Sequence, residues 1–302
     1  MSDRKKASLL VVVIDTNPVW WGQRLEDGPG KSLTQFLDSV MVFTNSHLMM
    51  SHRNKLAVIA AHTNQSCFLY PRTESQEAAA GGGEPGCSAG MNDGKYELFA
   101  QVNEQVMEEV KKLVLTSLEG QTETDSLLAG ALAMSLCYIH RCEKESFAGE
   151  DLSSRILIIK GSEDNPSQYM NFMNAVFTSQ KQNITIDACI LDNESGLLQQ
   201  ACDITGGIYM KIPQPSGLLQ YLLWVFLPDP TMRPKLTLPP KAQVDYRAAC
   251  FCHRNLIDIG YVCSVCLSIF CSFSPICSTC QTTFKFLGPP KIAKKKQKKP
   301  NS

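Results

Sequence analysis

The chain has 302 residues, enough for one large domain and a small module, and 44% of them are hydrophobic, as is usual for a globular protein with an apolar core. The formal net charge is zero, but six lysines lie in residues 291–302, so the rest of the chain carries 23 basic and 29 acidic side chains. This acidic balance excludes a general attraction of the large domain for phosphate backbones.

Targeting and membrane segments are not recognisable in the sequence. The apolar run at 9–14 ends at Asp15 and is too short for the core of a signal peptide with a cleavage site. The apolar stretch at 218–227 is well below the roughly 18 residues that suggest a membrane span. We therefore expect no membrane contact and a reducing compartment, where the thirteen cysteines do not form a disulfide framework.

Apolar runs in the first 228 residues predict strands that are covered on both faces. These runs lie at 8–15, 55–61, 154–160, 184–191 and 207–212. Apolar positions at helical spacing predict helices at 31–50, 97–118, 124–142, 166–182, 195–204 and 215–227. Thr122, with Asp125 three residues later, resembles a capping box at the start of the 124–142 helix. Strands that alternate with helices predict an α/β fold with a doubly wound, mostly parallel sheet.

The segment Asp15-Thr16-Asn17-Pro18-Val19 directly follows the first predicted strand. Ligand sites in open α/β sheets lie at this carboxyl end of the strands. An acidic residue with two hydroxyls would suit Mg²⁺, but Asn17 and Val19 occupy the positions that two serines would need, and Val19 cannot coordinate an ion. We expect no Mg²⁺ here, and we expect Asp15 to hydrogen-bond the following turn.

Catalytic and cofactor-binding motifs do not emerge from the sequence. The glycine pairs and triplets lack the pattern of a phosphate-binding loop, and the five histidines lack HExxH spacing. We therefore predict no catalytic residues and no cofactor-binding residues.

Two polar segments punctuate the chain. Residues 71–95 are rich in Gly, Ala, Ser and Glu, which predicts a flexible surface loop. Five prolines between 228 and 240 predict a linker that leaves the α/β domain. The predicted organisation is an α/β domain at 1–228, a Pro-rich linker at 229–249, a C4-type zinc finger at 250–287 and a Lys-rich tail at 288–302.

Seven of the thirteen cysteines lie between 250 and 280. Cys263, Cys266, Cys277 and Cys280 form two CxxC pairs that are separated by ten residues, and two such pairs complete a tetrahedral Zn²⁺ site. Four thiolates leave no coordination position for a substrate, so we expect a structural ion that holds together a module too small to rely on its own core. The neighbouring residues could form a second site, replace one ligand of the first, or pack as apolar thiols: Cys250, Cys252, His253 and Cys271.

The other residues of this module indicate what it binds. Only three residues between 250 and 290 are charged, whereas a DNA-reading finger normally shows several Lys or Arg side chains. Six aromatic residues are present instead, more than about forty residues can bury alone: Phe251, Tyr261, Phe270, Phe273, Phe284 and Phe286. An apolar zinc module of this kind is predicted to dock against protein.

Several stretches of the chain resemble one known family. The most specific reads ACFCHRNLIDIGYVCSVCLSIFC at 249–271 and continues with PICSTC at 275–280. Others read YMNFMNAVFTSQKQNI at 169–184, SGLLQQACDITGG at 195–207 and LLQYLLWVFLP at 218–228. Together with the strand–helix alternation, these stretches resemble one subunit family of general transcription and DNA repair factor IIH (TFIIH). This family is its third core subunit, which combines a von Willebrand factor A-like domain with a zinc finger.

The resemblance implies a nuclear scaffold subunit rather than an enzyme. In this family the A-like domain pairs with the zinc-binding region of a second A-like subunit of the TFIIH core. That complex opens promoter DNA for RNA polymerase II and damaged DNA in nucleotide excision repair, with its helicases in separate subunits. The resemblance thus implies indirect contact with the polymerase machinery and little or no direct DNA contact. The departure from the integrin-type metal motif DxSxS at Asp15–Val19 fits an A-like domain that binds protein without an ion.

Two alternative functions remain open from the sequence. A RING-like zinc ubiquitin ligase would need two interleaved sites with about eight ligands; seven cysteines and His253 could supply them, although the spacing of the first pair does not suit that arrangement. A zinc-containing nucleic-acid-binding protein could use KIAKKKQKK at 291–299. Such a run is more typical of a nuclear localisation signal or a solvated tail.

Overall fold

The computed structural model describes residues 7–26, 32–72, 94–117, 124–145, 152–240, 243–253 and 255–284. The chain divides into two compact units, Met1–Asp245 and Tyr246–Ser302, and each is described by itself. This division falls within the predicted linker, while the predicted domain limits stay predictions. Most of the predicted loop at 71–95 and all of the Lys-rich tail lie outside the described residues.

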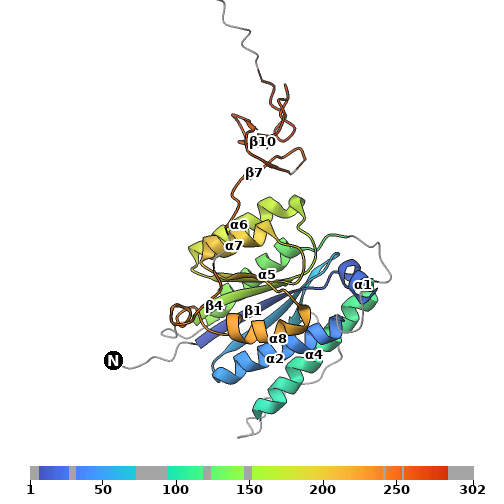
Figure 1. Ribbon diagram of the computed structural model, residues 1–302, viewed down its shortest axis with the longest axis vertical. Coiled ribbons are helices and arrows are strands. Elements are labelled where there is room, and N and C mark those ends of the chain that lie inside the picture. Colours follow the sequence, from blue (N-terminus) through green and yellow to red (C-terminus); the bar gives the residue numbers. More distant parts are fainter. Residues whose placement is uncertain are drawn as a thin grey trace, which may run out of the picture. The chain divides into compact units, whose positions relative to one another are not determined.

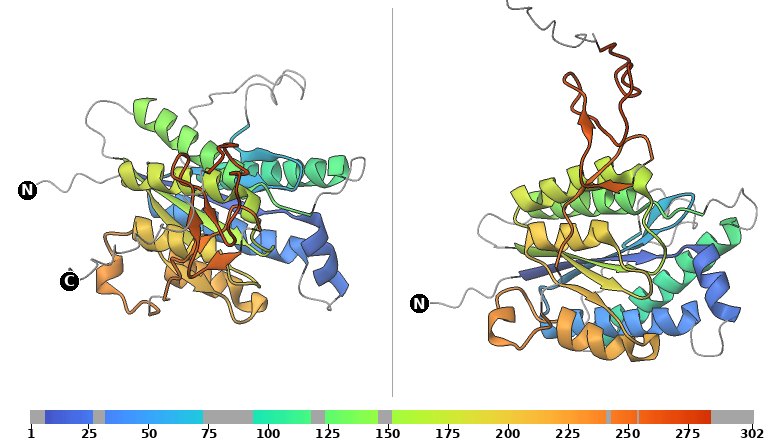
Figure 2. Two further views of the ribbon diagram at one scale, coloured as in Figure 1. Left: turned by 90° about the horizontal axis from the view of Figure 1, so that it is seen from above. Right: turned by 45° about the horizontal axis from the view of Figure 1, so that its top comes forward.

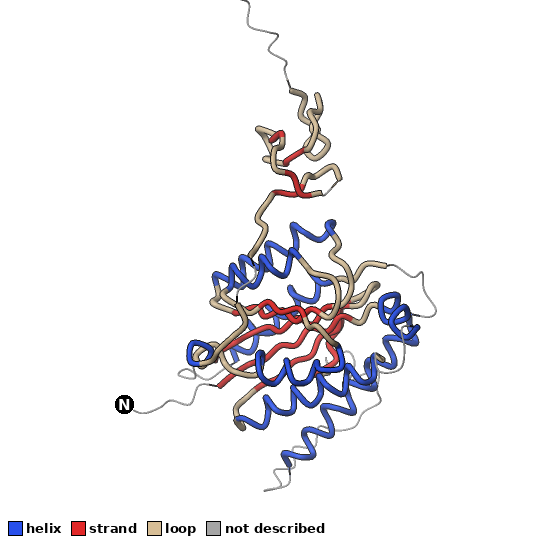
Figure 3. The backbone as a smooth tube through the Cα atoms, viewed as in Figure 1, coloured by secondary structure: helices blue, strands red, loops and turns tan. Residues whose placement is uncertain are grey.

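A six-stranded sheet in the order β3-β2-β1-β4-β5-β6 forms the centre of the first unit (Figure 3). All neighbouring strands are parallel except β3, which runs antiparallel to β2 at the edge. The strands are β1 (Ala7–Asp15), β2 (Lys55–Ala61), β3 (Ser66–Tyr70), β4 (Leu152–Lys160), β5 (Thr185–Ile190) and β6 (Tyr209–Lys211). The predicted α/β class with a doubly wound, mostly parallel sheet is confirmed.

Helices cover both faces of this sheet (Figures 1 and 2). One layer holds α1 (Pro18–Glu26), α2 (Leu33–Met50), α4 (Gly94–Ser117) and α8 (Leu218–Tyr221), which continues as a π-helical turn at Leu222–Phe226. The other layer holds α5 (Leu128–Glu145), α6 (Tyr169–Lys181) and α7 (Gly196–Thr205). Short 3₁₀ turns lie at Pro166–Gln168, Pro215–Gly217 and Arg233–Lys235. None of the helices that the structure describes is long and apolar enough to span a membrane.

The central strand β1 explains why the two layers form. All nine of its residues are buried. Leu10, Val12 and Ile14 pack against one helical layer, whereas the alternating residues Leu9, Val11 and Val13 pack against the other. A strand that is apolar on both faces can be buried only between two layers, which is what its unbroken apolar run predicted.

The start of α5 differs from the sequence prediction. The helix begins at Leu128, three residues after Asp125, and Thr122 lies outside the described residues. The cap comes from another segment: Gln168 Oε1 accepts a hydrogen bond from Ala129 N at 3.1 Å, and Gln168 Nε2 donates to Ser126 O at 2.8 Å. A side chain that is distant in the sequence therefore satisfies a first-turn amide, which no local capping motif could reveal.

Two buried arginines tie the end of α8 and the following segment to the sheet. Arg155, on β4, donates to the carbonyl oxygens of Phe226, Leu227 and Pro228 at 2.7, 2.9 and 3.1 Å. These carbonyls lie at a helix end, where intrahelical donors are lacking, so the guanidinium acts as a C-terminal cap. Arg233, within the predicted linker, pairs with Asp187 of β5. The first part of the predicted linker thus packs into the first unit.

The described residues of the second unit form two short antiparallel ladders and include few buried apolar side chains. β7 (Ala248–Ala249) pairs with β8 (Leu256–Ile257), and β9 (Tyr261–Val262) pairs with β10 (Ile269–Phe270). A backbone hydrogen bond of 2.7 Å from Phe251 N to Ile269 O links the segment after β7 to β10. Its described apolar core is small and includes the buried residues Cys263, Phe270 and Cys277. Cross-links other than apolar packing are needed to hold such a unit together.

Candidate metal centres and the carboxyl end of the sheet

The four cysteines of the two CxxC pairs converge in the second unit. Their sulfur atoms all lie within 4.8 Å of one another. The Cys263–Cys280 and Cys266–Cys277 sulfur pairs are 3.7 and 3.5 Å apart. Tetrahedral Zn²⁺ with Zn–S bonds of about 2.3 Å would place its sulfur ligands roughly 3.8 Å apart. This cluster, which we call site 1, therefore has a geometry that could hold one metal ion.

The two knuckles of site 1 are structural repeats of each other. Cys263 N donates to Ser268 O at 2.9 Å, and Cys277 N donates to Thr282 O at 3.0 Å. The residue after the second cysteine has a positive φ in both knuckles, 61° at Leu267 and 58° at Gln281. The repeat is visible in the sequence as CSVCLS and CSTCQT, a match that the CxxC spacing alone does not capture.

A hydroxyl group two residues later contacts the second cysteine of each knuckle. The Ser268 Oγ–Cys266 Sγ distance is 3.1 Å, and the Thr282 Oγ1–Cys280 Sγ distance is 3.2 Å. The Ser268 hydroxyl lowers the pKa of the Cys266 thiol to about 6, and the Thr282 hydroxyl lowers the pKa of Cys280. Both contacts favour the thiolate, which is the form that binds metal.

The additional candidate residues form a second cluster, which we call site 2. The ligand atoms of Cys250, Cys252, His253 and Cys271 all lie within 4.8 Å of one another. Cys271 Sγ is 3.3 Å from Cys252 Sγ and 3.2 Å from His253 Nδ1. Cys250 is buried, whereas the apolar cluster described in the second unit contains none of the four residues.

Apolar side chains are widely exposed in the second unit. Of the six aromatics noted in the sequence, only Phe270 is buried; Phe284 is half-buried, and Phe286 lies outside the described residues. The exposed large apolar side chains are Tyr246, Phe251, Leu256, Ile259, Tyr261, Val262, Val265, Leu267, Phe273 and Ile276. Exposed apolar surface on this scale is typical of a protein-binding module.

In the first unit, Asp15 lies at the carboxyl end of β1 with only 3% of its surface exposed. Its Oδ1 accepts hydrogen bonds from Ser126 Oγ at 2.8 Å and from the backbone N of Asn17 at 3.2 Å. Its Oδ2 accepts from Gly161 N, Ser162 N and Ser162 Oγ at 3.2, 2.9 and 2.5 Å. These five bonds use the acceptor capacity of the carboxylate, so a cation would have to displace protein donors to reach it.

Asn17 has a role that the sequence analysis missed. Its Oδ1 accepts hydrogen bonds from Val19 N at 3.0 Å and Trp20 N at 3.3 Å, so it caps α1, which begins at Pro18. Its Nδ2 donates to Ser126 Oγ at 3.2 Å. Asn followed by Pro is a sequence signature of a helix start, and this signal could have predicted α1.

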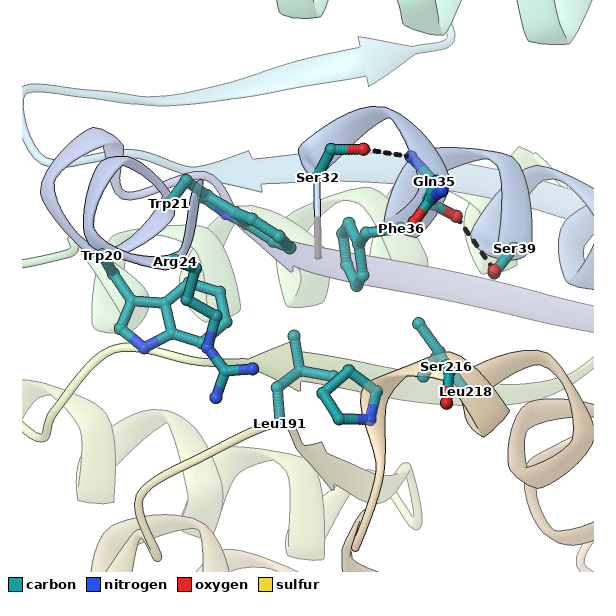
Figure 4. A pocket seen from close by; sticks show the side chains of 11 residues that line it. Trp20, Trp21, Arg24, Ser32, Gln35, Phe36, Ser39, Leu191, Ser216 and Leu218 are labelled. Carbon is teal, nitrogen blue, oxygen red and sulfur yellow. Dashed lines mark hydrogen bonds between the residues drawn. The ribbon is translucent and has the colours of Figure 1, made fainter. Parts of the chain in front are cut away.

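A pocket of about 380 Å³ lies beside this network, between α1, the start of α2, the end of β5 and Pro215–Gly217 (Figure 4). Trp20, Trp21 and Phe36 supply aromatic walls. Arg24 lies over the Trp20 ring, 4.6 Å from its centroid, and pairs with Asp192 at 3.0 Å. Trp21 Nε1 donates to Asp15 O at 2.9 Å, so this aromatic pocket is built directly on the end of β1.

Three described cysteines of the first unit, Cys67, Cys189 and Cys202, lie in surroundings that disfavour the thiolate. Cys142, Cys189 and Cys202 are buried, and burial raises the pKa of the Cys189 and Cys202 thiols. Burial likewise raises the pKa of Cys67 to about 11. Thiols held in the protonated form are poor nucleophiles. Cys67, Cys189 and Cys202 therefore suit apolar packing better than catalysis.

The chain matches the family described as transcription factor Tfb4 over residues 7–281. It is 39% identical over 277 residues to the general transcription and DNA repair factor IIH subunit tfb4 of Schizosaccharomyces pombe, covering 92% of this chain and 89% of that protein. It is 40% identical over 263 residues to the general transcription factor IIH subunit 3 of Dictyostelium discoideum, covering 83% of this chain and 68% of that protein.

A solved structure adds to this similarity. The crystal structure of the TFIIH p34 N-terminal domain matches with a TM-score of 0.58 and 30% sequence identity. The match covers 72% of this chain and 97% of that one. From the family match, the identity of the relatives and the likeness of the fold, the chain belongs to the Tfb4 family of TFIIH subunits.

Proposed function

We propose that this chain is a non-catalytic structural subunit of the TFIIH core, which acts in RNA polymerase II transcription initiation and nucleotide excision repair in the nucleus. The observation that carries the proposal is the family match, which extends through both units to residue 281. One relative is named as a subunit of general transcription and DNA repair factor IIH, and another as a subunit of general transcription factor IIH. Other core subunits are the partners, above all the second A-like zinc-binding subunit.

Exposed apolar side chains support a role in protein–protein contact. Trp224, on the π-helical turn after α8, is 78% exposed, whereas Trp20 and Trp21 are buried. Large apolar side chains also remain exposed across the second unit. Tryptophan is enriched among the residues that dominate binding energy in protein interfaces. We therefore propose Trp224 as one contact of the first unit with another subunit.

We further propose that site 1 holds a structural Zn²⁺ ion through Cys263, Cys266, Cys277 and Cys280. Four thiolates in a closed tetrahedral arrangement favour zinc over oxygen-preferring ions such as Mg²⁺. The ion cross-links two knuckles in a unit that buries little apolar surface. Binding by the first unit is proposed to need no Mg²⁺, since Asp15 is already saturated by protein donors.

Co-expression of the full chain with the other TFIIH core subunits tests the assembly role. We expect the chain to co-purify and co-elute with them. Trp224→Ala should weaken this assembly by roughly 30-fold, which corresponds to a hot spot of about 2 kcal/mol, without lowering the melting temperature. Tyr96→Ala, an exposed aromatic on α4, serves as the matched control. A wild-type chain that stays monomeric in this experiment would contradict the proposal.

The two alternatives are tested separately. The family match and the relatives give no support to a ubiquitin ligase, and a transfer assay with ubiquitin-conjugating enzymes is expected to be negative. Direct DNA contact is proposed to be weak or absent. If the folded units bind DNA themselves, a salt-dependent affinity should survive deletion of residues 288–302.

A further inference from the structure

We propose that the chain carries a second Zn²⁺ ion at site 2, held by Cys250, Cys252, His253 and Cys271, and that the ligands of the two sites are interleaved along the chain. The second unit would then be a single module held together by two ions. Without the second ion, only the segment that contains site 1 would be held by metal. This inference goes beyond the assembly role and does not depend on it.

The ligand atoms of site 2 lie close enough together to hold one metal ion. All four ligand atoms lie within 4.8 Å of one another. Cys271 Sγ is 3.3 Å from Cys252 Sγ and 3.2 Å from His253 Nδ1. Bonds of about 2.3 Å to sulfur and about 2.0–2.1 Å to nitrogen place tetrahedral ligands roughly 3.5–3.8 Å apart. Both distances are somewhat shorter than these values, and they are far longer than the roughly 2.05 Å of a disulfide.

Burial does not explain why these four side chains meet. Cys250 is buried, but Cys271 is only half-buried, and Cys252 and His253 are exposed. Apolar packing would bring thiols together in the interior of a protein. Three members of this cluster are exposed or half-buried, and one of them, His253, has a polar side chain. A shared ligand accounts for both the convergence and the exposure.

The backbone fixes three of the ligands in one turn and brings the fourth to them. The turn after β7 carries Cys250, Cys252 and His253, and Cys250 N donates to Asn255 O at 2.9 Å. Cys271 directly follows β10. The hydrogen bond of 2.7 Å from Phe251 N to Ile269 O joins the turn to β10, so the contact between the two segments is independent of the sulfur atoms.

The ligand set selects the ion. Three thiolates and one imidazole are the Cys₃His set of structural zinc sites, and this set disfavours Mg²⁺ and Ca²⁺, which require oxygen ligands. With four protein ligands, the site has no open position, so the ion would be structural.

The order of ligands along the chain links the two sites. Three ligands of site 2 come first, then Cys263 and Cys266 of site 1, then Cys271 of site 2, then Cys277 and Cys280 of site 1. The segment that joins the two knuckles of site 1 therefore carries a ligand of site 2. Because each ion fixes part of the chain that the other must order, binding at one site should favour binding at the other.

Metal counting on the purified full chain tests the proposal. Native mass spectrometry should find two zinc ions per chain in the wild type. Cys271→Ser and His253→Ala should each lose one ion, and the remaining ion should be removed more readily by a chelator. Two matched controls lie in α5 at exposed positions, Cys137→Ser and His140→Ala, and both should keep two ions.

A second measurement covers the case in which the variants fail to fold. Co²⁺ substituted into the wild-type full chain should saturate at two equivalents, with visible absorption bands of both a four-sulfur and a three-sulfur, one-nitrogen site. One equivalent, or two zinc ions retained by Cys271→Ser and His253→Ala, would overturn the second site. Chelator resistance of site 1 that is unchanged in those variants would overturn the linkage between sites. Co-purification with TFIIH subunits is scored separately, so either proposal can fail alone.

Discussion

Arg233 and Asp187 form a two-point ion pair in the interior of the first unit. Arg233 Nη1 donates to Asp187 Oδ1 at 2.8 Å, Nη2 contacts Oδ2, and the two side chains are 8% and 2% exposed. Asp187 Oδ1 also accepts from Ile208 N at 2.9 Å. The pair connects the segment after α8 to β5, so it joins parts of the chain that are 46 residues apart.

Removal of Arg233 should destabilise the protein, because the carboxylate of Asp187 would remain buried without a counterion. Arg233→Met leaves a buried carboxylate without its counterion, so we expect a loss of about 3–5 kcal/mol in the free energy of unfolding, measured by urea denaturation. Asp187→Asn combined with Arg233→Met should recover part of the loss. Lys112→Met removes an exposed lysine from Glu109, which keeps Arg72 as a partner, so stability should change by less than about 1 kcal/mol. A small effect of Arg233→Met would show that the pair contributes little.

The buried imidazole of His47 should make stability depend on pH. Burial, together with the positive charge of Arg155, lowers the pKa of His47 from 6.5 to about 4. At a pH between these two pKa values, His47 is protonated in the unfolded chain but neutral in the folded chain. The stabilisation is therefore complete above pH 6.5 and is lost as the pH falls towards 4.

We expect this linkage to remove about 2 kcal/mol of stability between pH 7 and pH 5. The variant His47→Leu cannot bind a proton at this position. Its free energy of unfolding should therefore fall by about 2 kcal/mol less than that of the wild type between pH 7 and pH 5. Urea denaturation of both proteins at the two pH values measures the difference. If the two stabilities fall in parallel, His47 is not the group responsible.

The Asp15 network should contribute to stability without an ion. Asp15→Ala leaves Ser126, Ser162 and buried backbone amides without their acceptor, so we expect a loss of about 3 kcal/mol or more in the free energy of unfolding. Ser162→Ala removes a single hydroxyl donor and should cost less, about 1–2 kcal/mol. Added Mg²⁺ or a chelator of Mg²⁺ should leave the melting temperature of the wild-type first unit unchanged. A rise with Mg²⁺ would mean that an ion displaces these donors.

The knuckle hydroxyls should tune metal affinity at site 1. Ser268→Ala and Thr282→Val remove the contacts to Cys266 Sγ and Cys280 Sγ, and loss of such outer-shell partners typically lowers metal affinity 10–100-fold. Competition with a chromophoric chelator measures the change. Ser264→Ala, at an exposed position inside the first knuckle, is the control and should keep wild-type affinity. Equal affinities in all variants would assign the hydroxyls a purely conformational role.

The central part of the fold could be predicted from sequence because its signals are local. The buried parallel strands are unbroken apolar runs, and the strand predicted at 8–15 corresponds to β1, which begins one residue earlier at Ala7. The sequence prediction does not include the edge strand β3. This strand is only five residues long and mostly half-buried, so it has no long, unbroken apolar run. The Asn17-Pro18 signal marks the start of α1, whereas the sequence prediction treats Asn17 only as a departure from a metal-binding motif.

The candidate sites show the same division between local and distant information. CxxC spacing identified all four residues of site 1, because each pair forms a tight turn of the chain. The sequence leaves a second site at Cys250, Cys252, His253 and Cys271 as one of three possibilities, because their convergence depends on a backbone contact between β10 and Phe251. The partners of Arg155 lie more than 70 residues away, so an arginine inside an apolar strand gave no indication of what it caps.

The cap that Arg155 provides also sets the limits for deletion mapping of this protein. A fragment cut before Phe226 would leave a buried guanidinium facing no carbonyl groups, and one cut at residue 228 would remove the counterion of Asp187. Gln200 Nε2 further binds Asp245 O at 2.7 Å. Truncations inside 226–245 should therefore produce misfolded protein, and loss of partner binding in such fragments would report on folding rather than on the location of an interface.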